Sequence, residues 1–143
     1  MKKILLIHGP NLNLLGERDA ALYGNFTLAR IEGKVKKEAK KFGARIMTFQ
    51  SNHEGALIDF LQKHGEADGI IINPGALAHY SYALHDALLD SSAEKVEVHL
   101  SDIFKREKWR GVSITAPACE KIISGKKMNG YLEALRYLAK TKK

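Results

Sequence analysis

Short apolar runs of strand length recur along the chain, and stretches with helical spacing separate them. Strands are predicted over residues 2–7, 44–49, 68–74, 95–100 and 111–115. Residues 68–74, DGIIINP, are almost continuously apolar, which is typical of a strand covered on both faces. The run GVSIT at 111–115 is the shortest, and it is the predicted fifth strand.

Amphipathic stretches lie between these strands. The clearest, over residues 27–42, places five apolar side chains on one helical stripe: Leu28, Ile31, Val35, Ala39 and Phe42. Ser51 and Glu54 have the spacing of a capping box, which predicts a helix start at that point. Two more helices are predicted over residues 81–89 and 129–140.

This alternation of strands and helices predicts an α/β fold with a parallel sheet and right-handed crossovers. A chain of 143 residues, 45% of them apolar, is expected to form one domain over residues 1–143. In parallel sheets of this kind, ligands bind beyond the carboxyl ends of the strands. Polar residues that directly follow a strand are therefore the first candidates for a site.

The net charge of +7 raises nucleic acid as a possible partner. The lysines, however, lie mostly in GKVKKEAKKFG (33–43) and in the terminal KTKK, which are typical of a solvated helix face and a frayed end. No aromatic residues interleave with them, as single-strand binding would require. We therefore expect no nucleic-acid partner, and instead an attraction for small anionic ligands.

Several common classes of protein lack their signatures here. The single cysteine, Cys119, allows no intramolecular disulfide and suits a reducing cytoplasm, where we expect the protein to act. No stretch approaches the ~20 apolar residues of a membrane span, so no membrane partner is expected. Neither a G-x-G-x-x-G motif, a P-loop, an H-E-x-x-H pair nor a nucleophile elbow is present, and a metal site is not expected.

Polar side chains do follow three of the predicted strands. Asn11 comes after the first, Asn73 after the third, and His99 with Ser101 after the fourth. Strand alternation places Glu97 on the same side as His99, which it could orient. Backbone N–H groups of the segment NPGALAHYS (73–81) favour an anion.

Simpler interpretations exist for each of these residues. A histidine at a strand end is more often structural than catalytic, and an asparagine there is usually a turn residue. Arg106 and Arg110, four residues apart, could pair with Asp102 and Glu107. Tyr23, at the end of the long polar loop HGPNLNLLGERDAALYG, could be part of the core. The joint interpretation is stronger, because three strand ends carry polar groups at once.

Five segments in order carry a resemblance that spans nearly the whole chain: GPNLNLLGER…YG, QSNHEGALIDFL, INPGALAHYSYALHDAL, EVHLSDIFKREKWR and NGYLEALRYL. Together they resemble the type II dehydroquinase (3-dehydroquinate dehydratase) family. The resemblance implies a flavodoxin-like, doubly wound, five-stranded parallel sheet in three αβα layers. It also implies a homo-oligomer, a dodecamer built from trimers.

The same resemblance implies a reaction and roles for individual residues. The substrate would be 3-dehydroquinate, which loses water reversibly to give 3-dehydroshikimate through an enolate, with no cofactor, no metal and no Schiff base. Tyr23 would be the base and His99 the acid. Arg18 would activate Tyr23, and Asn11 would stabilise the enolate through a water molecule. The substrate-binding residues would be Asn73, His79, Leu100, Ser101 and Arg110, with Asp86 from a neighbouring subunit.

Some positions depart from the family pattern. His85 stands before Asp86 where the family usually has arginine, and Ala20 and Gly111 replace a usual proline and histidine. The main rival is a non-enzymatic flavodoxin-like binding or signalling module. A signalling receiver would need acidic residues after the first strand, where Asn11 and Asn13 stand, and a flavin carrier would need a Ser/Thr-rich loop there. Aromatic biosynthesis through chorismate and quinate breakdown both remain open as the metabolic role.

Overall fold

The sheet has five strands, all parallel, in the order β2-β1-β3-β4-β5. This structure is a computed structural model that describes residues 1–141, so the predicted frayed lysines 142 and 143 lie outside the described residues. The strands are β1 (Lys2–His8), β2 (Ala44–Gln50), β3 (Gly69–Asn73), β4 (Glu94–His99) and β5 (Lys121–Ser124). The predicted doubly wound α/β fold is confirmed.

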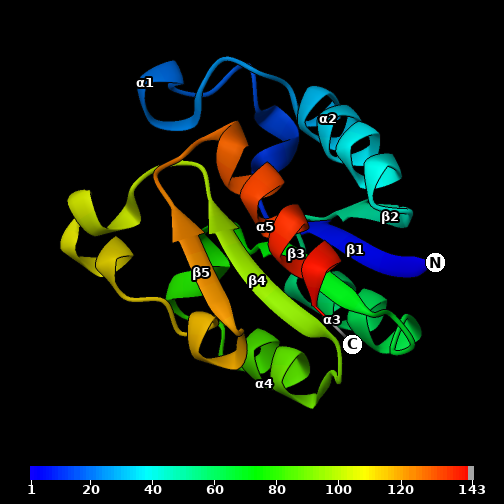
Figure 1. Cartoon of the computed structure of the whole chain (residues 1–143). Helices are drawn as coiled ribbons and strands as arrows, with labels where there is room; N and C mark the ends of the chain where they lie inside the picture. The colour runs from blue at the N-terminus through cyan, green and yellow to red at the C-terminus, as the bar shows by residue number, and fades with distance from the viewer. Residues whose placement is uncertain (142–143) are drawn as a thin grey trace.

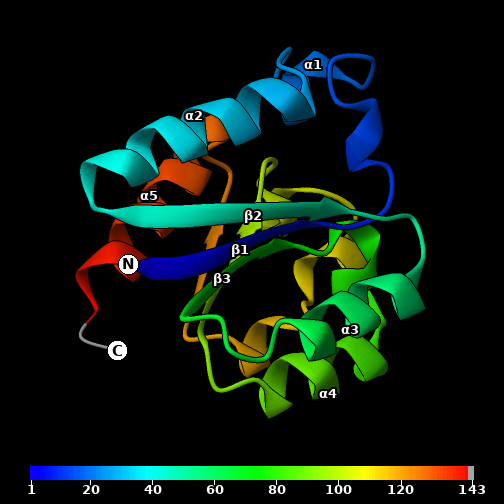
Figure 2. The same ribbon diagram turned by 90° about the vertical axis from the view of Figure 1, so that its right-hand side faces the viewer.

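Helices cover both faces of this sheet. They are α1 (Ala20–Tyr23), α2 (Leu28–Lys41), α3 (Glu54–Lys63), α4 (Tyr82–Asp90) and α5 (Met128–Lys140). Helices α2 and α5 lie on one face, and α3 and α4 lie on the other, which gives three layers (Figure 2). Short 3-10 helices complete the connections: η1 (Leu12–Leu14), η2 (Gly75–His79), η3 (Ile103–Lys105), η4 (Lys108–Gly111) and η5 (Ala116–Ala118).

The apolar core is divided into two by the sheet. On β1, Ile4 and Leu6 pack towards α2 and α5, whereas Leu5 and Ile7 pack towards α3 and α4. All four side chains are fully buried, as are those of the central β3 run. Alternate residues of a strand point to opposite faces, so a continuously apolar strand is what a sheet covered twice requires.

The fifth strand was wrongly predicted. It is formed by residues 121–124, KIIS, whereas Gly111 ends η4 and residues 112–115 form an irregular connection. GVSIT alternates between apolar and polar residues, whereas KIIS has two adjacent isoleucines, and a run of four or five residues is too short for periodicity to identify a strand. Ser113 and Thr115 donate hydrogen bonds from their hydroxyls to the buried Glu97 carboxylate, and this contact fixes the segment beside β4 instead of in the sheet.

The predicted capping box was also wrong. Helix α3 begins at Glu54 with His53 as its N-cap, and Ser51 Oγ accepts a hydrogen bond from the His53 N–H. The Glu54 carboxylate instead accepts a hydrogen bond from the hydroxyl of Ser81, the N-cap of α4. The spacing was right for a local cap, but a partner from a distant segment holds this carboxylate.

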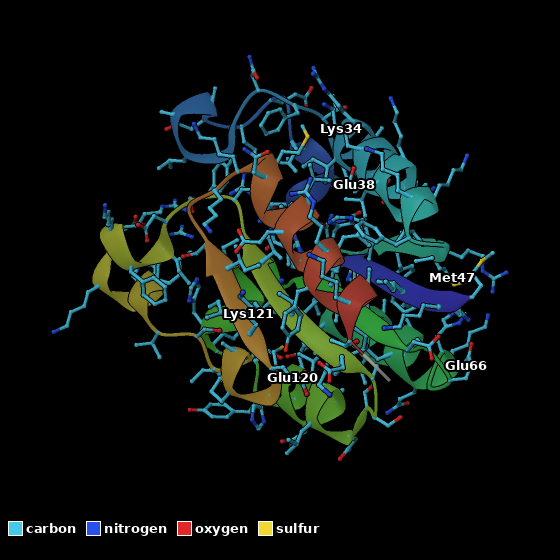
Figure 3. All side chains as sticks on the ribbon, viewed as in Figure 1. Lys34, Glu38, Met47, Glu66, Glu120 and Lys121 are labelled. Atoms are coloured by element: carbon cyan, nitrogen blue, oxygen red, sulfur yellow. The ribbon has the colours of Figure 1, made fainter. Side chains whose placement is uncertain are left out.

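The basic residues of α2 face solvent, as predicted. Lys34, Lys36, Lys37, Lys40 and Lys41 are all exposed. Lys34 and Glu38 of α2 are labelled in Figure 3, and Glu38, which is only partly exposed, forms an ion pair with Arg136 of the neighbouring α5 at 3.0 Å. Charge on this face therefore lies in the helical layer and not at the strand ends.

The carboxyl ends of the strands meet one set of loops. The chain passes from β1 outward to β2 and from β3 outward to β4, so a crevice opens between β1 and β3. The first turns of the two loops touch: the Gly9 N–H donates to the Asn73 carbonyl at 2.7 Å, and a Cβ on Gly9 would lie 2.2 Å from the Pro74 oxygen. Among residues 1–141, no helix is long and apolar enough to cross a membrane.

Candidate active site

A cleft lies beyond the carboxyl ends of β1, β3 and β4. In Figure 1, α1 and the segment that carries η3 and η4 lie at this end of the sheet. The cleft is lined by Pro10, Asn11, Leu12, Arg18, Tyr23, Asn73, Gly75, Ala76, His79, His99, Leu100, Ser101, Ile103, Arg106 and Arg110. Of the ten residues proposed from the sequence, the structure brings nine together here, and Asp86 is the exception.

Tyr23 ends the short helix α1, whose N-cap Asp19 accepts a hydrogen bond from the Ala21 N–H. Its side chain is 9% exposed, and its hydroxyl accepts hydrogen bonds from two guanidinium groups. Arg18 Nη2 and Arg106 Nη1 each lie 2.9 Å from the hydroxyl oxygen. The Arg18 guanidinium also lies over the ring, 3.9 Å from its centroid. Two permanently charged donors therefore converge on one phenol oxygen.

His99 is the last residue of β4 and contacts Glu97, which lies on the same side of the strand as alternation predicted. His99 Nε2 lies 2.7 Å from Glu97 Oε2, and both side chains are buried. Because the carboxylate contacts Nε2, the Nδ1 nitrogen is left for other partners. A carboxylate that accepts one ring N–H holds an imidazole in a fixed tautomer and stabilises its protonated form.

Asn73 is held by bonds on both sides of its amide. Its Nδ2 donates to the Tyr131 hydroxyl at 3.0 Å, and its Oδ1 accepts from the Gly75 N–H at 3.0 Å. Tyr131, on α5, is fully buried, and this burial raises the pKa of its phenol. The neutral Tyr131 side chain of α5 therefore fixes the orientation of the Asn73 amide in the cleft.

His79 and Arg110 line the far side of the cleft. His79 Nδ1 lies 2.7 Å from the Val112 carbonyl, and burial lowers the pKa of His79 below its usual value. Arg110 Nε donates to Glu107 at 2.9 Å, and this bond lowers the pKa of the Glu107 carboxyl. The pairing of Arg110 with Glu107 was one of the simpler interpretations, and it coexists with a place in the cleft.

Two backbone turns complete the lining. Asn11 adopts a left-handed conformation with φ of 71°, and its N–H donates to the Asn52 side chain at 3.0 Å. The carbonyls of Leu100 and Ser101 accept hydrogen bonds from the N–H groups of Lys127 and Gly125. The turn after β4 is therefore tied to the turn before α5.

Arg106 is the cleft residue that sequence reasoning did not assign. It donates to Tyr23, and its Nη1 also lies 3.1 Å from Ser101 Oγ. Arg106 lies between two separate turns, η3 and η4, whereas Arg110 lies within η4. Asp102, its other suggested partner, forms an ion pair with Lys105. The only sequence signal was a second arginine near Arg110.

Asp86 lies on α4, and it does not line the cleft. Its side chain is 75% exposed, and within residues 1–141 it lies 3.1 Å from the His85 ring. Tyr82 and Leu89 of the same helix are also exposed, by 68% and 60%. The three residues are spaced by four and three, so they form one outward face of α4.

The described part of the chain contains no cluster of side chains that could bind a metal ion together. Within residues 1–141, no group of three or more His, Cys, Asp or Glu side chains is placed to hold a metal ion. Cys119 is partly buried, and desolvation raises the pKa of its thiol. The chemistry on offer in the cleft is that of phenol, imidazole, guanidinium and amide groups.

This sheet order, with a polar cleft at its switch point, defines a doubly wound α/β protein with a small-molecule site. A sequence model of the family described as Dehydroquinase class II matches residues 2–139. The 3-dehydroquinate dehydratase of Roseiflexus castenholzii is 52% identical, over 98% of this chain and 90% of that protein. That of Thermotoga neapolitana is 49% identical, over 96% and 94%.

Solved structures agree with these sequence matches. The type II dehydroquinase of Butyrivibrio crossotus superposes with a TM-score of 0.93 at 44% identity, over 96% of this chain and 97% of that one. The type II dehydroquinase of Propionibacterium acnes superposes with a TM-score of 0.94 at 31% identity, over 99% and 98%. The chain belongs to the class II dehydroquinase family.

The Tyr131–Asn73 bond yields the first testable prediction. Tyr131→Phe leaves the buried Asn73 amide without its acceptor, and we expect the free energy of unfolding to fall by about 1–3 kcal/mol. Tyr137→Phe, on the same helix and only partly buried, is the matched control and should change it by less than about 0.5 kcal/mol. Urea denaturation measures both, and equal stabilities would contradict the prediction.

Proposed function

We propose that this chain catalyses the reversible elimination of water from 3-dehydroquinate, giving 3-dehydroshikimate. The observation that carries the proposal is the Tyr23 hydroxyl between the guanidinium groups of Arg18 and Arg106, in the cleft that also holds the His99–Glu97 pair. The relatives named above support the substrate, because both are 3-dehydroquinate dehydratases. The reaction is a hydro-lyase step of the shikimate pathway, towards chorismate and the aromatic amino acids.

Tyr23, as its phenolate, removes a proton from the carbon beside the ketone, and the electrons move onto the ketone oxygen as an enolate. One guanidinium about 4 Å from an oxyanion contributes ~4 kcal/mol at an effective dielectric near 20, before desolvation is subtracted. Two such groups lie at the Tyr23 oxygen. The two arginines therefore place positive charge where the proposed phenolate would carry its negative charge.

The enolate then expels the hydroxyl at the neighbouring carbon. His99, protonated and paired with Glu97, gives a proton to that hydroxyl, which leaves as water. Asn11 stabilises the enolate oxygen through a bound water molecule. The carboxylate of the substrate is held by the backbone of Leu100 and Ser101 and by the Ser101 hydroxyl. Asn73, His79 and Arg110 bind its remaining oxygens.

The loop from Asn11 to Tyr23 supplies catalytic groups, and it also covers the site against water. It carries the proposed base and one of its two arginines, and it lies over the crevice between β1 and β3. Closing a loop over a carbon acid excludes the water that would compete for the base. A long polar loop after the first strand is what such a reaction requires.

Tyr23→Phe tests the base. The variant keeps the ring and the fold, so substrate binding should persist, while kcat falls by ~10²–10⁴ because only a transition-state interaction is lost. The rise of ultraviolet absorbance of the conjugated product measures the rate. Tyr137→Phe should retain wild-type kcat. If Tyr23→Phe kept more than about a tenth of the activity, another group would be the base.

Absence of a Schiff base gives a second test. No lysine is among the described residues that line the cleft, so no amine is placed to attack the ketone. Borohydride added with substrate should leave activity intact and produce no covalent adduct in the mass spectrum, and a chelator should likewise have no effect. Inactivation that depends on substrate and borohydride together would refute this mechanism.

The site is completed, we propose, by Asp86 of a neighbouring subunit, in trimers that assemble to a dodecamer. Asp86 is absent from its own chain's cleft, and its outward face with Tyr82 and Leu89 has no cover within the described chain. Exposed apolar residues beside an acidic one suit a symmetric interface between copies. We further propose that the chain is one domain that acts in the cytoplasm.

Mixing of variants tests this assembly. Light scattering should give a mass many times the 15.9 kDa of one chain. Asp86→Ala and Tyr23→Phe should each be impaired, and dissociating and reassembling them together should regain activity, because some mixed sites draw both intact residues from different chains. Asp90→Ala, also exposed on α4, is the matched control. A fully active monomer, or no regain of activity on mixing, would overturn the proposal.

A further inference from the structure

The segment of residues 112–116, here called the 112–116 segment, contacts His79 directly and His99 through Glu97. The Val112 carbonyl lies 2.7 Å from His79 Nδ1, and Ser113 Oγ donates to Glu97 at 2.6 Å. The Thr115 hydroxyl donates to the other oxygen of the Glu97 carboxylate. One short irregular segment therefore touches His79 directly and His99 through Glu97.

The same segment is fastened to the element that carries His79. The Ile114 N–H donates to the Ala78 carbonyl at 2.6 Å, directly before His79 at the end of η2. At its other end, Ser113 Oγ accepts from the Ala116 N–H at 3.0 Å and opens η5. These bonds fix the backbone around Ser113 and Thr115, so both hydroxyls keep a constant position relative to Glu97.

Glu97 depends on these hydroxyls because it is fully buried. A buried carboxylate is stable in its charged form only when hydrogen bonds and an opposite charge replace water. The three donors here are His99, Ser113 and Thr115. Without the hydroxyls, the carboxylate would retain His99 as its one side-chain donor and would be free to rotate.

We propose that Ser113 and Thr115 are positioning residues that lock Glu97, so that His99 keeps its proton on Nε2 and presents Nδ1 to the cleft. The Val112 carbonyl does the same for His79, whose Nδ1–H it accepts, leaving Nε2 for a ligand. The 112–116 segment thereby sets the tautomer of both histidines. The catalytic part of this inference rests on the proposed function, whereas the tautomers do not.

The two rings need different partners because they lie close together. Their centroids are 6.2 Å apart, with planes inclined by 23°. Burial lowers the pKa of His79, and the nearby His99 and Arg110 lower it further, whereas the hydrogen bond to the Val112 carbonyl acts in the opposite direction. The Glu97 carboxylate contacts the His99 ring, and the Val112 carbonyl contacts the His79 ring, so the two rings have different partners.

Two substitutions and two controls test the proposal. Thr115→Val and Ser113→Ala remove the hydroxyls, singly and together, with little change in volume. Thr115→Ser keeps a hydroxyl and is the conservative rescue. Ser91→Ala removes a hydroxyl that accepts the Ala93 N–H at 3.3 Å, near the opposite end of β4, and controls for general loss of one hydrogen bond.

Ring nitrogen shifts of ¹⁵N-histidine protein, without substrate, report the tautomers directly. We expect neutral His99 to be wholly in the Nε2–H form in the wild type, in Thr115→Ser and in Ser91→Ala. In Thr115→Val and in the double variant, its two nitrogen shifts should move towards each other as the tautomers mix. Unchanged His99 shifts in folded Thr115→Val protein would overturn the proposal, even if the double variant does not fold.

Kinetics provide the second measurement. Thr115→Val should lower kcat at least tenfold, with KM within about threefold, because proton donation in the transition state is lost and binding is not. Thr115→Ser should restore most of it. An equal loss in Ser91→Ala would show a merely structural effect and contradict the proposal. If the wild type had no dehydratase activity, the proposed reaction would fail, but the nitrogen shifts would still decide the positioning role.

Discussion

The parallel register of β1, β3 and β4 determines where every strand-end side chain of the cleft lies. His8 is paired with Asn73, and His99 with Ser124, so the strands end at one edge and their last residues form a single row. The turns beyond that edge are packed against each other through Gly9, at a point where no side chain fits. The loop that carries Tyr23 therefore starts from a fixed base. The positions of the loops that follow β1, β3 and β4 therefore depend on this edge of the sheet.

Polar groups at this edge are rigid because each is both buried and bonded. Asn73 is 3% exposed and is held by the Tyr131 hydroxyl and the Gly75 N–H. Glu97 is fully buried and accepts hydrogen bonds from three side chains. An unpaired polar group in such surroundings would be costly, so satisfied networks select one arrangement. The amide and imidazole positions are thus set before any ligand arrives.

The cationic groups come from the loops, and they give the cleft its electrostatic character. Arg18 and Arg106 share the Tyr23 oxygen, while Arg110 is balanced by Glu107 on the same short turn. Arginine suits this role because its planar, permanently charged group donates in several directions at once. The lysines that account for much of the net charge of +7 lie on the outer face of α2 instead. The net charge alone would therefore have pointed to the outer face of α2, and not to the cleft, as the binding surface.

Local sequence determined four of the strands, the long helices and the strand-end positions of Asn73 and His99, since hydrophobic period and chain direction are local properties. It wrongly placed the fifth strand at residues 111–115 instead of 121–124, because in runs this short the pairing with β4, and not the local pattern, decides which segment joins the sheet. Tertiary structure likewise decided which arginines contact the Tyr23 hydroxyl. Arg18 is five residues away, but Arg106 is 83 residues away and reaches it only because the loops after β1 and β4 meet at one edge of the sheet.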